Sequence, residues 1–379
     1  MIYFDNAATT KVSDEAARAV YLAMTESYGN PSSSHALGRE AREIIGTARK
    51  TVAAAIGAQP ETIYFTSGGT EADNLAIISA AENMKRRGGH ILTTAIEHDA
   101  VLKCMAELER QGFEVEYIKP DRHGDIPVSA FESALREDTV LVSLMLVNNE
   151  VGSVLPVAEV SKMLRRRKSQ ALLHTDAVQG FLKIPFTVKS LGADLLTLSA
   201  HKIHGPKGVG ALYVRKGLRL LPRSFGGGQE SGLRAGTESV PLIAGFGAAV
   251  EQGLKSRERD IAEMSKIRDY IRAQLRVRLP EAKILGSAAA PHILCLSLPG
   301  YKSEVLLNWL DMRGICVSKG SACKKGRRSH VLEAMGLSSG EIDGALRVSL
   351  SAQNTMEEAE AFVSAFAEAK NELYGVLGK

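Results

Sequence analysis

Segments with helical periodicity alternate with short apolar segments from about residue 13 to about residue 215. This alternation is typical of an α/β domain, in which helices cover a mainly parallel sheet. Residues 140–147 form a continuous apolar run, as expected of a strand that is buried on both faces. Ser13 can cap a helix that reaches Met24. The sequence therefore predicts an α/β fold.

The pattern changes near residue 251. Residues 251–279 are charged and helical in period, and we expect them to lead into a smaller α+β C-terminal domain. Residues 292–298 and 314–318 are expected strands there, and residues 356–377 an amphipathic helix. The expected organisation is a large domain of residues 13–255 and a small domain made of residues 1–12 and 256–379.

Length and charge exclude several classes of protein. The 379 residues are enough for two domains, and the net charge of +4 is too weak a bias to indicate nucleic-acid binding. No apolar run approaches the roughly 18 residues that a membrane helix needs. Residues 1–6 lack the basic and apolar regions of a signal peptide. We therefore expect a cytoplasmic protein with no membrane or direct nucleic-acid partner.

The four cysteines do not suggest a metal site or a disulfide scaffold, because none forms a C-x-x-C pair. Cys104, Cys295 and Cys316 stand among apolar residues and are interpreted as small core side chains. Cys323 differs, since glycines and several cations surround it and cations favour the nucleophilic thiolate. We interpret Cys323 as a candidate nucleophile; a chance surface cysteine is the alternative.

Lys202 follows one predicted apolar strand, and Asp176 ends another. Lys202 precedes a Gly-Pro-Lys-Gly turn, and a lysine so placed can form a Schiff base with an aldehyde. An aspartate at the end of a buried strand can keep a pyridinium nitrogen protonated. Pyridoxal 5'-phosphate (PLP) needs both groups, because its ring accepts electrons only while that nitrogen holds its proton. The pair predicts a PLP site.

A phosphate site is expected where Ser-Gly-Gly-Thr, residues 67–70, joins a strand to a helix. Free N–H groups and the helix dipole attract anions there, so Gly69 and Thr70 are candidate phosphate ligands. Many such turns carry glycine for geometry alone. Ser199 and His201 flank Lys202 and can donate to the same phosphate. For His201, a surface-loop histidine is the alternative.

Three further residues are candidates for contacts with the ring or the substrate. His98 follows a strand and can stack on a ring or shuttle protons, although an ordinary hydrogen-bonded histidine fits equally well. Asn149 ends the buried strand, where ligands of α/β proteins bind, and a turn asparagine is its alternative. Arg347 lies in an alternating strand and can grip a carboxylate; an edge-strand arginine facing water is its alternative.

The motifs together resemble the cysteine desulfurases of the class V aminotransferase superfamily. The resemblance covers nearly the whole chain and is carried by residues 3–10, 29–33, 66–71, 147–150, the Asp176 and Lys202 motifs, and residues 234–237, 320–323, 329–332 and 346–349. It implies a PLP-dependent transferase of fold type I with a mainly parallel seven-stranded sheet. It also implies a homodimer.

The resemblance assigns roles to particular residues. It implies that Lys202 carries the Schiff base, that Asp176 contacts the pyridine nitrogen, and that His98 is a catalytic residue stacked on the ring. The other implied contacts are Gln179 on the phenolic oxygen, Asn149 and Arg347 on the substrate, Gly69, Thr70, Ser199 and His201 on the phosphate, and Thr237 on the phosphate of the partner's cofactor.

The implied reaction converts L-cysteine to L-alanine, with the sulfur held on Cys323 as a persulfide. An acceptor protein, either an iron–sulfur scaffold or a tRNA-thiolation protein, would then take the sulfur. Only five residues, all basic or glycine, separate Cys323 from Ser329, which is a shorter and more basic loop than in many relatives. The alternatives are a selenocysteine lyase, a transaminase or a non-catalytic sulfur-transfer scaffold.

Overall fold

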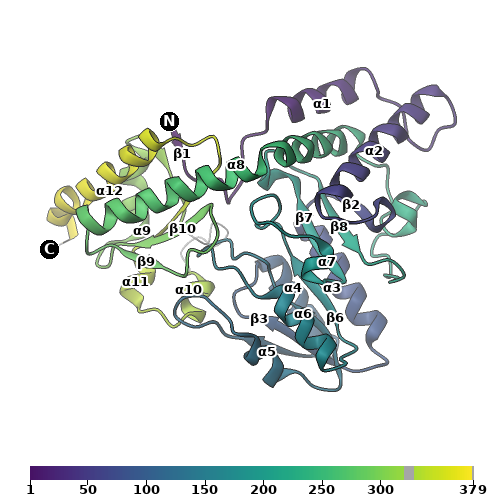
Figure 1. The fold of residues 1–379 in the computed structure, drawn as a ribbon, viewed down its shortest axis with the longest axis horizontal. Helices are drawn as coiled ribbons and strands as arrows, with labels where there is room; N and C mark the ends of the chain where they lie inside the picture. Colours follow the sequence, from purple (N-terminus) through teal and green to yellow (C-terminus); the bar gives the residue numbers. More distant parts are fainter. Residues whose placement is uncertain (320–327, 378–379) are drawn as a thin grey trace.

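The computed structural model describes residues 1–319 and 328–377. A seven-stranded sheet forms the centre of the larger part of the molecule (Figure 1). In spatial order its strands are β2 (Ile63–Thr66), β8 (Gly210–Val214), β7 (Leu195–Ser199), β6 (Leu172–Asp176), β5 (Thr139–Ser143), β3 (His90–Thr94) and β4 (Glu114–Ile118). Only β8 runs antiparallel to its neighbours. The prediction of an α/β fold with a mainly parallel seven-stranded sheet is confirmed.

Helices cover both faces of this sheet, because its strands carry apolar side chains on alternate faces. Leu195 packs in a core with α3 (Gly69–Met84) and α4 (Asp99–Arg110). The next residue, Leu196, packs in the opposite core with α6 (Val157–Arg166) and α7 (Val188–Leu191). The sheet is thus sandwiched between two helical layers, which leaves its carboxyl edge as the open place for a site.

Helix α8 (Val240–Arg278) joins the two parts of the molecule (Figure 1). The helix begins at Val240, whereas the sequence pattern indicated a start near residue 251. Its first half packs closely on α1 (Asp14–Thr25) and α2 (Ala36–Ala55). A Cβ on Gly247 would lie 2.8 Å from the Cβ of Ala48, so this glycine permits the close approach of α8 and α2.

The C-terminal part contains two small sheets. The order β12 (Ala345–Ser349), β10 (Ile293–Ser297) and β9 (Lys283–Leu285) makes an antiparallel sheet. Strand β1 (Ile2–Tyr3) pairs in parallel with β11 (Ile315–Cys316). The remaining helices are α5 (Val128–Ala134), α9 (Ser303–Asp311), α10 (His330–Ala334), α11 (Ser339–Asp343) and α12 (Met356–Leu377).

The N-terminal residues pack with the C-terminal part of the chain. The Phe4 ring meets the edge of Phe362 in α12, with 5.9 Å between ring centroids. Ser349 N donates to Phe4 O, and Ala7 N donates to the Ser349 hydroxyl. These contacts carry residues 5–9 across from the small sheet toward the large one. Within the described residues, no helix has the length and apolarity needed to cross a bilayer.

Candidate active site

One pocket lies beyond the carboxyl ends of the parallel strands. It brings together most of the residues predicted from the sequence: Gly69, Thr70, His98, Asn149, Asp176, Gln179, His201, Lys202 and Arg347. Ser199 lines an adjoining pocket with Gly69, Thr70 and His201. Thr237 is exposed and lines neither pocket. Cys323 lies outside the described residues.

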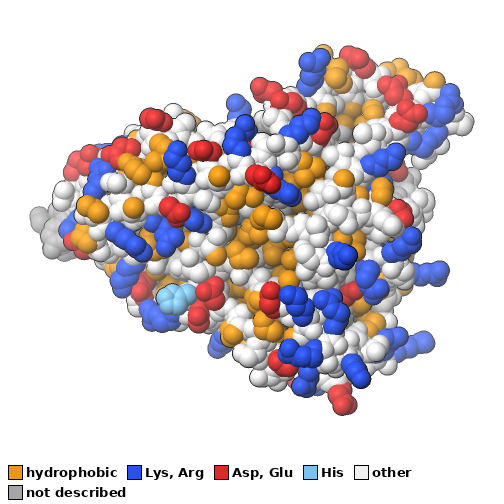
Figure 2. Space-filling model, viewed as in Figure 1, with side chains coloured by type: hydrophobic (Ala, Val, Ile, Leu, Met, Phe, Trp, Pro, Cys, Tyr) orange, Lys and Arg blue, Asp and Glu red, His pale blue; other side chains and the backbone are white. Residues whose placement is uncertain are grey.

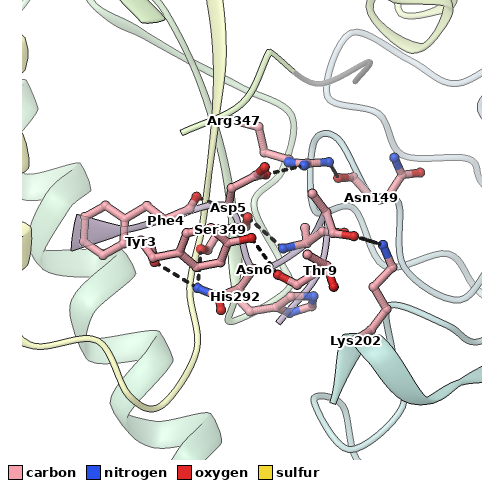
Figure 3. Close-up of polar contacts among 12 residues, drawn as sticks. Tyr3, Phe4, Asp5, Asn6, Thr9, Asn149, Lys202, His292, Arg347 and Ser349 are labelled. Atoms are coloured by element: carbon pink, nitrogen blue, oxygen red, sulfur yellow. Dashed lines mark hydrogen bonds and ion pairs between the residues drawn. The ribbon is translucent and has the colours of Figure 1, made fainter. Parts of the chain in front are cut away.

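Lys202 lies in a short turn, Ala200–Lys202, that directly follows β7. Its Nζ donates to the carbonyl oxygens of Ala7 and Ala8, at 2.7 Å each (Figure 3). The turn is tight, because a Cβ on Gly205 would lie 2.9 Å from Ala200 O. Through the two hydrogen bonds, the N-terminal segment holds the Lys202 amine in the pocket.

Asp176 ends β6, and its Oδ1 accepts from Val178 N at 2.9 Å. Burial, with the nearby Asp73 carboxyl, raises the pKa of Asp176 to about 7. A cation placed against this carboxyl favours its ionised form, since opposite charge lowers a carboxyl pKa. Asp176 is thus suited to hold a protonated ring nitrogen.

Asp73 is a buried carboxyl near Asp176 that the sequence did not predict. Asp73 Oδ1 is 3.5 Å from His174 Nε2, and His174 Nδ1 bonds to the Ser143 hydroxyl at 2.9 Å. Burial raises the pKa of Asp73 to about 7 and lowers the pKa of His174 to about 4. The sequence does place Asp73 among the apolar residues Ala72, Leu75 and Ala76 of a buried helix, and a charged residue in such a position could have indicated a functional role.

The turn at residues 67–70 has the geometry of an anion site. Helix α3 starts at Gly69, and Gly68 has a φ of 153°. The Ser199 hydroxyl is buried and has no hydrogen-bond partner among the described residues. His201 Nδ1 lies 3.2 Å from the Thr9 hydroxyl, while burial and then Lys202 lower its pKa to about 4. Neutral donors and the N-terminus of α3 therefore meet at this end of the pocket.

His98 and Gln179 are oriented by their own hydrogen bonds. His98 caps α4, and its Nδ1 accepts from Ala100 N at 3.1 Å, which assigns the proton of the neutral ring to Nε2. Gln179 Nε2 donates to Ala7 O at 2.9 Å, and its Oε1 lies 3.4 Å from His292 Nε2. Both side chains line the pocket.

Arg347 does not face water, although β12 lies at one edge of its sheet, because its side chain is only 3% exposed. Its Nη1 donates to the main-chain oxygen of Asn149 at 2.8 Å, and its Nη2 donates to Asp5 Oδ1 at 2.8 Å (Figure 3). Its Nε is buried without a partner among the described residues. Asp5 was missed, since a partner 342 residues away leaves no local pattern.

The structure is an α/β fold in which a lysine and a buried aspartate line one pocket at the carboxyl edge of a mainly parallel sheet. Residues 2–362 match the model of the family described as aminotransferase class-V. The chain belongs to the aminotransferase class-V family.

Similar proteins carry related names. A protein of Trichormus azollae named "Cysteine desulfurase" is 42% identical over 97% of this chain and 92% of its own length. "Cysteine desulfurase IscS" of Methanosarcina thermophila is 42% identical over 95% of this chain and 89% of its own. A solved structure titled "NifS-like protein" is 39% identical and has a TM-score of 0.93; the match covers 98% of this chain and 100% of that protein.

Proposed function

We propose that this protein is a PLP-dependent cysteine desulfurase, which converts L-cysteine to L-alanine and passes the sulfur to an acceptor. The observation that carries the proposal is the convergence of Lys202, Asp176 and Arg347 on one pocket. A tethering amine, a ring-nitrogen partner and a carboxylate ligand are the three groups that PLP chemistry on an amino acid requires. The names of the relatives support cysteine as the substrate.

The residues present fit PLP. Asp176 would hold the ring nitrogen and Lys202 Nζ the aldehyde carbon. His98 would lie on the ring, Gln179 would reach the phenolic oxygen, and Gly69, Thr70, Ser199 and His201 would bind the phosphate. The Ser199 hydroxyl, which has no partner in the part of the chain that the structure describes, and the raised pKa of Asp176 support this fit, because a phosphate and a pyridinium would satisfy both groups. When bound, PLP supplies an electron sink for the amino acid attached to it.

The chain's own side chains then bind, orient and move protons. Arg347 and Asn149 would hold the substrate carboxylate, which fixes the position of its Cα. Lys202 Nζ would take the proton from that carbon, and His98 Nε2 would serve as a second proton carrier facing the pocket. The carbonyls of Ala7 and Ala8, which accept from Lys202 Nζ in this structure, would help to keep the amine near that carbon.

Sulfur transfer is assigned to Cys323. Its thiolate would bond to the substrate sulfur, and the carbon–sulfur bond would break with its electron pair left on carbon. That carbon takes up a proton and becomes the methyl group of alanine. The sulfur stays on Cys323 as a persulfide, from which an acceptor protein, such as an iron–sulfur scaffold or a tRNA-thiolation protein, would remove it.

We also propose a cytoplasmic homodimer in which the exposed Thr237 reaches the phosphate of the cofactor bound by the partner. The proposed large domain is residues 13–255, and the proposed small domain is residues 1–12 and 256–379. The pairing of β1 with β11 and the contact of Phe4 with Phe362 support the inclusion of the N-terminal residues in the small domain.

The test is incubation of the holoenzyme with L-cysteine and a reducing thiol, with alanine and sulfide quantified together. The proposal predicts equal amounts of the two products. The Cys323→Ala variant should bind cysteine with a colour change yet fail to turn over, whereas the control Cys316→Ala should remain active. Pyruvate or another keto acid in place of alanine would instead identify a transaminase or a different lyase. Unchanged sulfide release from Cys323→Ala would defeat the nucleophile assignment.

A further inference from the structure

The guanidinium of Arg347 is already engaged by groups of its own chain. Its side chain is 3% exposed, so water does little to balance its charge. Nη1 donates to Asn149 O, Nη2 donates to Asp5 Oδ1, and Nε alone has no partner among the described residues. A carboxylate that binds arginine in the favourable two-bond manner must use two of these nitrogens. Each η nitrogen carries two N–H groups, so such a carboxylate would share at least one nitrogen with Asp5 or Asn149.

Asp5 is held against Arg347 by the residues on either side of it. Phe4 is fully buried in the core of the C-terminal part. Asn6 donates through Nδ2 to Ser349 O at 3.1 Å, and Ser349 lies two residues from Arg347 on β12. Figure 3 shows the Asp5 carboxyl directed at the guanidinium from this braced segment. The ion pair is thus built into the fold.

The carboxylate of Asp5 is the more solvated partner, at 22% exposure. Two carboxylates on one guanidinium repel each other, and the repulsion is strong where little water intervenes. When a second carboxylate arrives, Asp5 can turn part of its charge toward water, at the cost of its bond to Nη2. That cost would reduce the binding energy of a ligand whose carboxylate contacts Arg347.

We propose that Asp5 is a specificity-determining residue that competes with the substrate carboxylate for Arg347. In the free enzyme it balances the buried charge and bonds to a nitrogen that the substrate carboxylate would share. The inference rests on the proposed function, because it takes Arg347 as the carboxylate ligand. Residues 5–8 would then have two roles: Asp5 contacts Arg347, and the carbonyls of Ala7 and Ala8 hold the Lys202 amine.

The test replaces Asp5 by Asn in the holoenzyme, which keeps an acceptor oxygen for Nη2 and removes the charge. We expect the KM for L-cysteine and the Kd for L-alanine, read from cofactor absorbance, to fall roughly fivefold, while kcat changes little. The affinity for cysteamine, which has no carboxylate, should stay the same. The control Asp14→Asn removes an equal charge from the exposed first turn of α1 and should change neither ligand's affinity.

Higher or unchanged values of KM and Kd in Asp5→Asn would overturn the proposal, and so would an equal gain for cysteamine. Should Asp5→Asn fail to fold, Asp5→Ser carries the same prediction. The L-alanine titration needs no turnover. A wild-type protein that makes no alanine from cysteine would therefore reject the proposed function while leaving the competition at Arg347 separately measurable.

Discussion

Glu230 is expected to be a major source of stability for the loop that precedes α8. Its side chain is 2% exposed, and its carboxylate accepts from Arg49 Nη1 and Nη2 at 2.7 Å each and from Phe65 N at 2.9 Å. The guanidinium of Arg49 also lies 4.8 Å from the centroid of the Phe65 ring. Loss of the charge on this carboxylate leaves the Arg49 cation without its ion-pair partner, although Arg49 Nη1 still donates to Ile63 O.

The magnitude follows from the burial of the two partners. Breaking a fully buried ion pair costs about 3–5 kcal/mol, and a hydrogen bond to a charged group about 1.5–3 kcal/mol. Because Arg49 keeps 21% of its side chain exposed, water compensates it in part. We therefore expect Glu230→Gln to lower the free energy of unfolding by about 2–3 kcal/mol and the Tm by roughly 2–6 °C.

The assay is thermal unfolding followed by circular dichroism, with two comparison variants. Glu251→Gln removes an exposed pair with Lys255, in which the side chains are 62% and 73% exposed, and should change the Tm little. Arg49→Met combined with Glu230→Gln should cost less than the sum of the single variants, since the two charges act on each other. A Glu230→Gln protein that melts within about 1 °C of the wild type would refute this reasoning.

Two further predictions concern Glu97 and Gly210. Burial raises the pKa of Glu97 to about 8, so the folded state holds this proton more tightly than the unfolded chain. Its contribution to stability is present below the unfolded pKa of about 4 and is lost as pH rises through about 8. The Tm should therefore drop less between about pH 6 and pH 9 in Glu97→Gln than in the wild type. An equal drop in both proteins would contradict the raised pKa of Glu97. A Cβ on Gly210 would lie 2.8 Å from Gly68 Cα and 2.6 Å from Leu198 O. Gly210→Ala should therefore weaken PLP binding by about tenfold or more in an absorbance titration, because overpacking shifts the phosphate turn. Gly46→Ala is its control, because no atom of the described residues lies within 4 Å of a Cβ at that position. Equal PLP affinity in both variants would count against the turn as the phosphate site.

Local signals made much of the fold predictable. Ser13 caps α1 as its sequence position indicated, with its side chain accepting from Ala16 N at 3.2 Å. The terminal helix α12 has the predicted bounds. The expected strand at residues 140–147 ends at Ser143, since Val147 bridges to Val154 instead. An apolar run thus indicated burial correctly but could not show where the chain leaves the sheet.

The site was predictable where a residue follows a strand, because the carboxyl ends of parallel strands meet at one edge. Asp176, Lys202 and Asn149 reach one pocket in this way. Asp5 and Asp73 were not predicted, since their importance comes from tertiary neighbours: Arg347 lies 342 residues from Asp5, and His174 lies on a different element from Asp73. Such contacts have no periodicity that a sequence could display.

The most direct test of the central claim is chemical trapping at Lys202. The freshly purified holoenzyme is reduced with borohydride and digested, and its peptides are analysed by mass spectrometry. We predict a pyridoxyl phosphate adduct on Lys202, with Lys207 in the same loop left unmodified. An unmodified Lys202 in a protein that retains its cofactor would contradict the account.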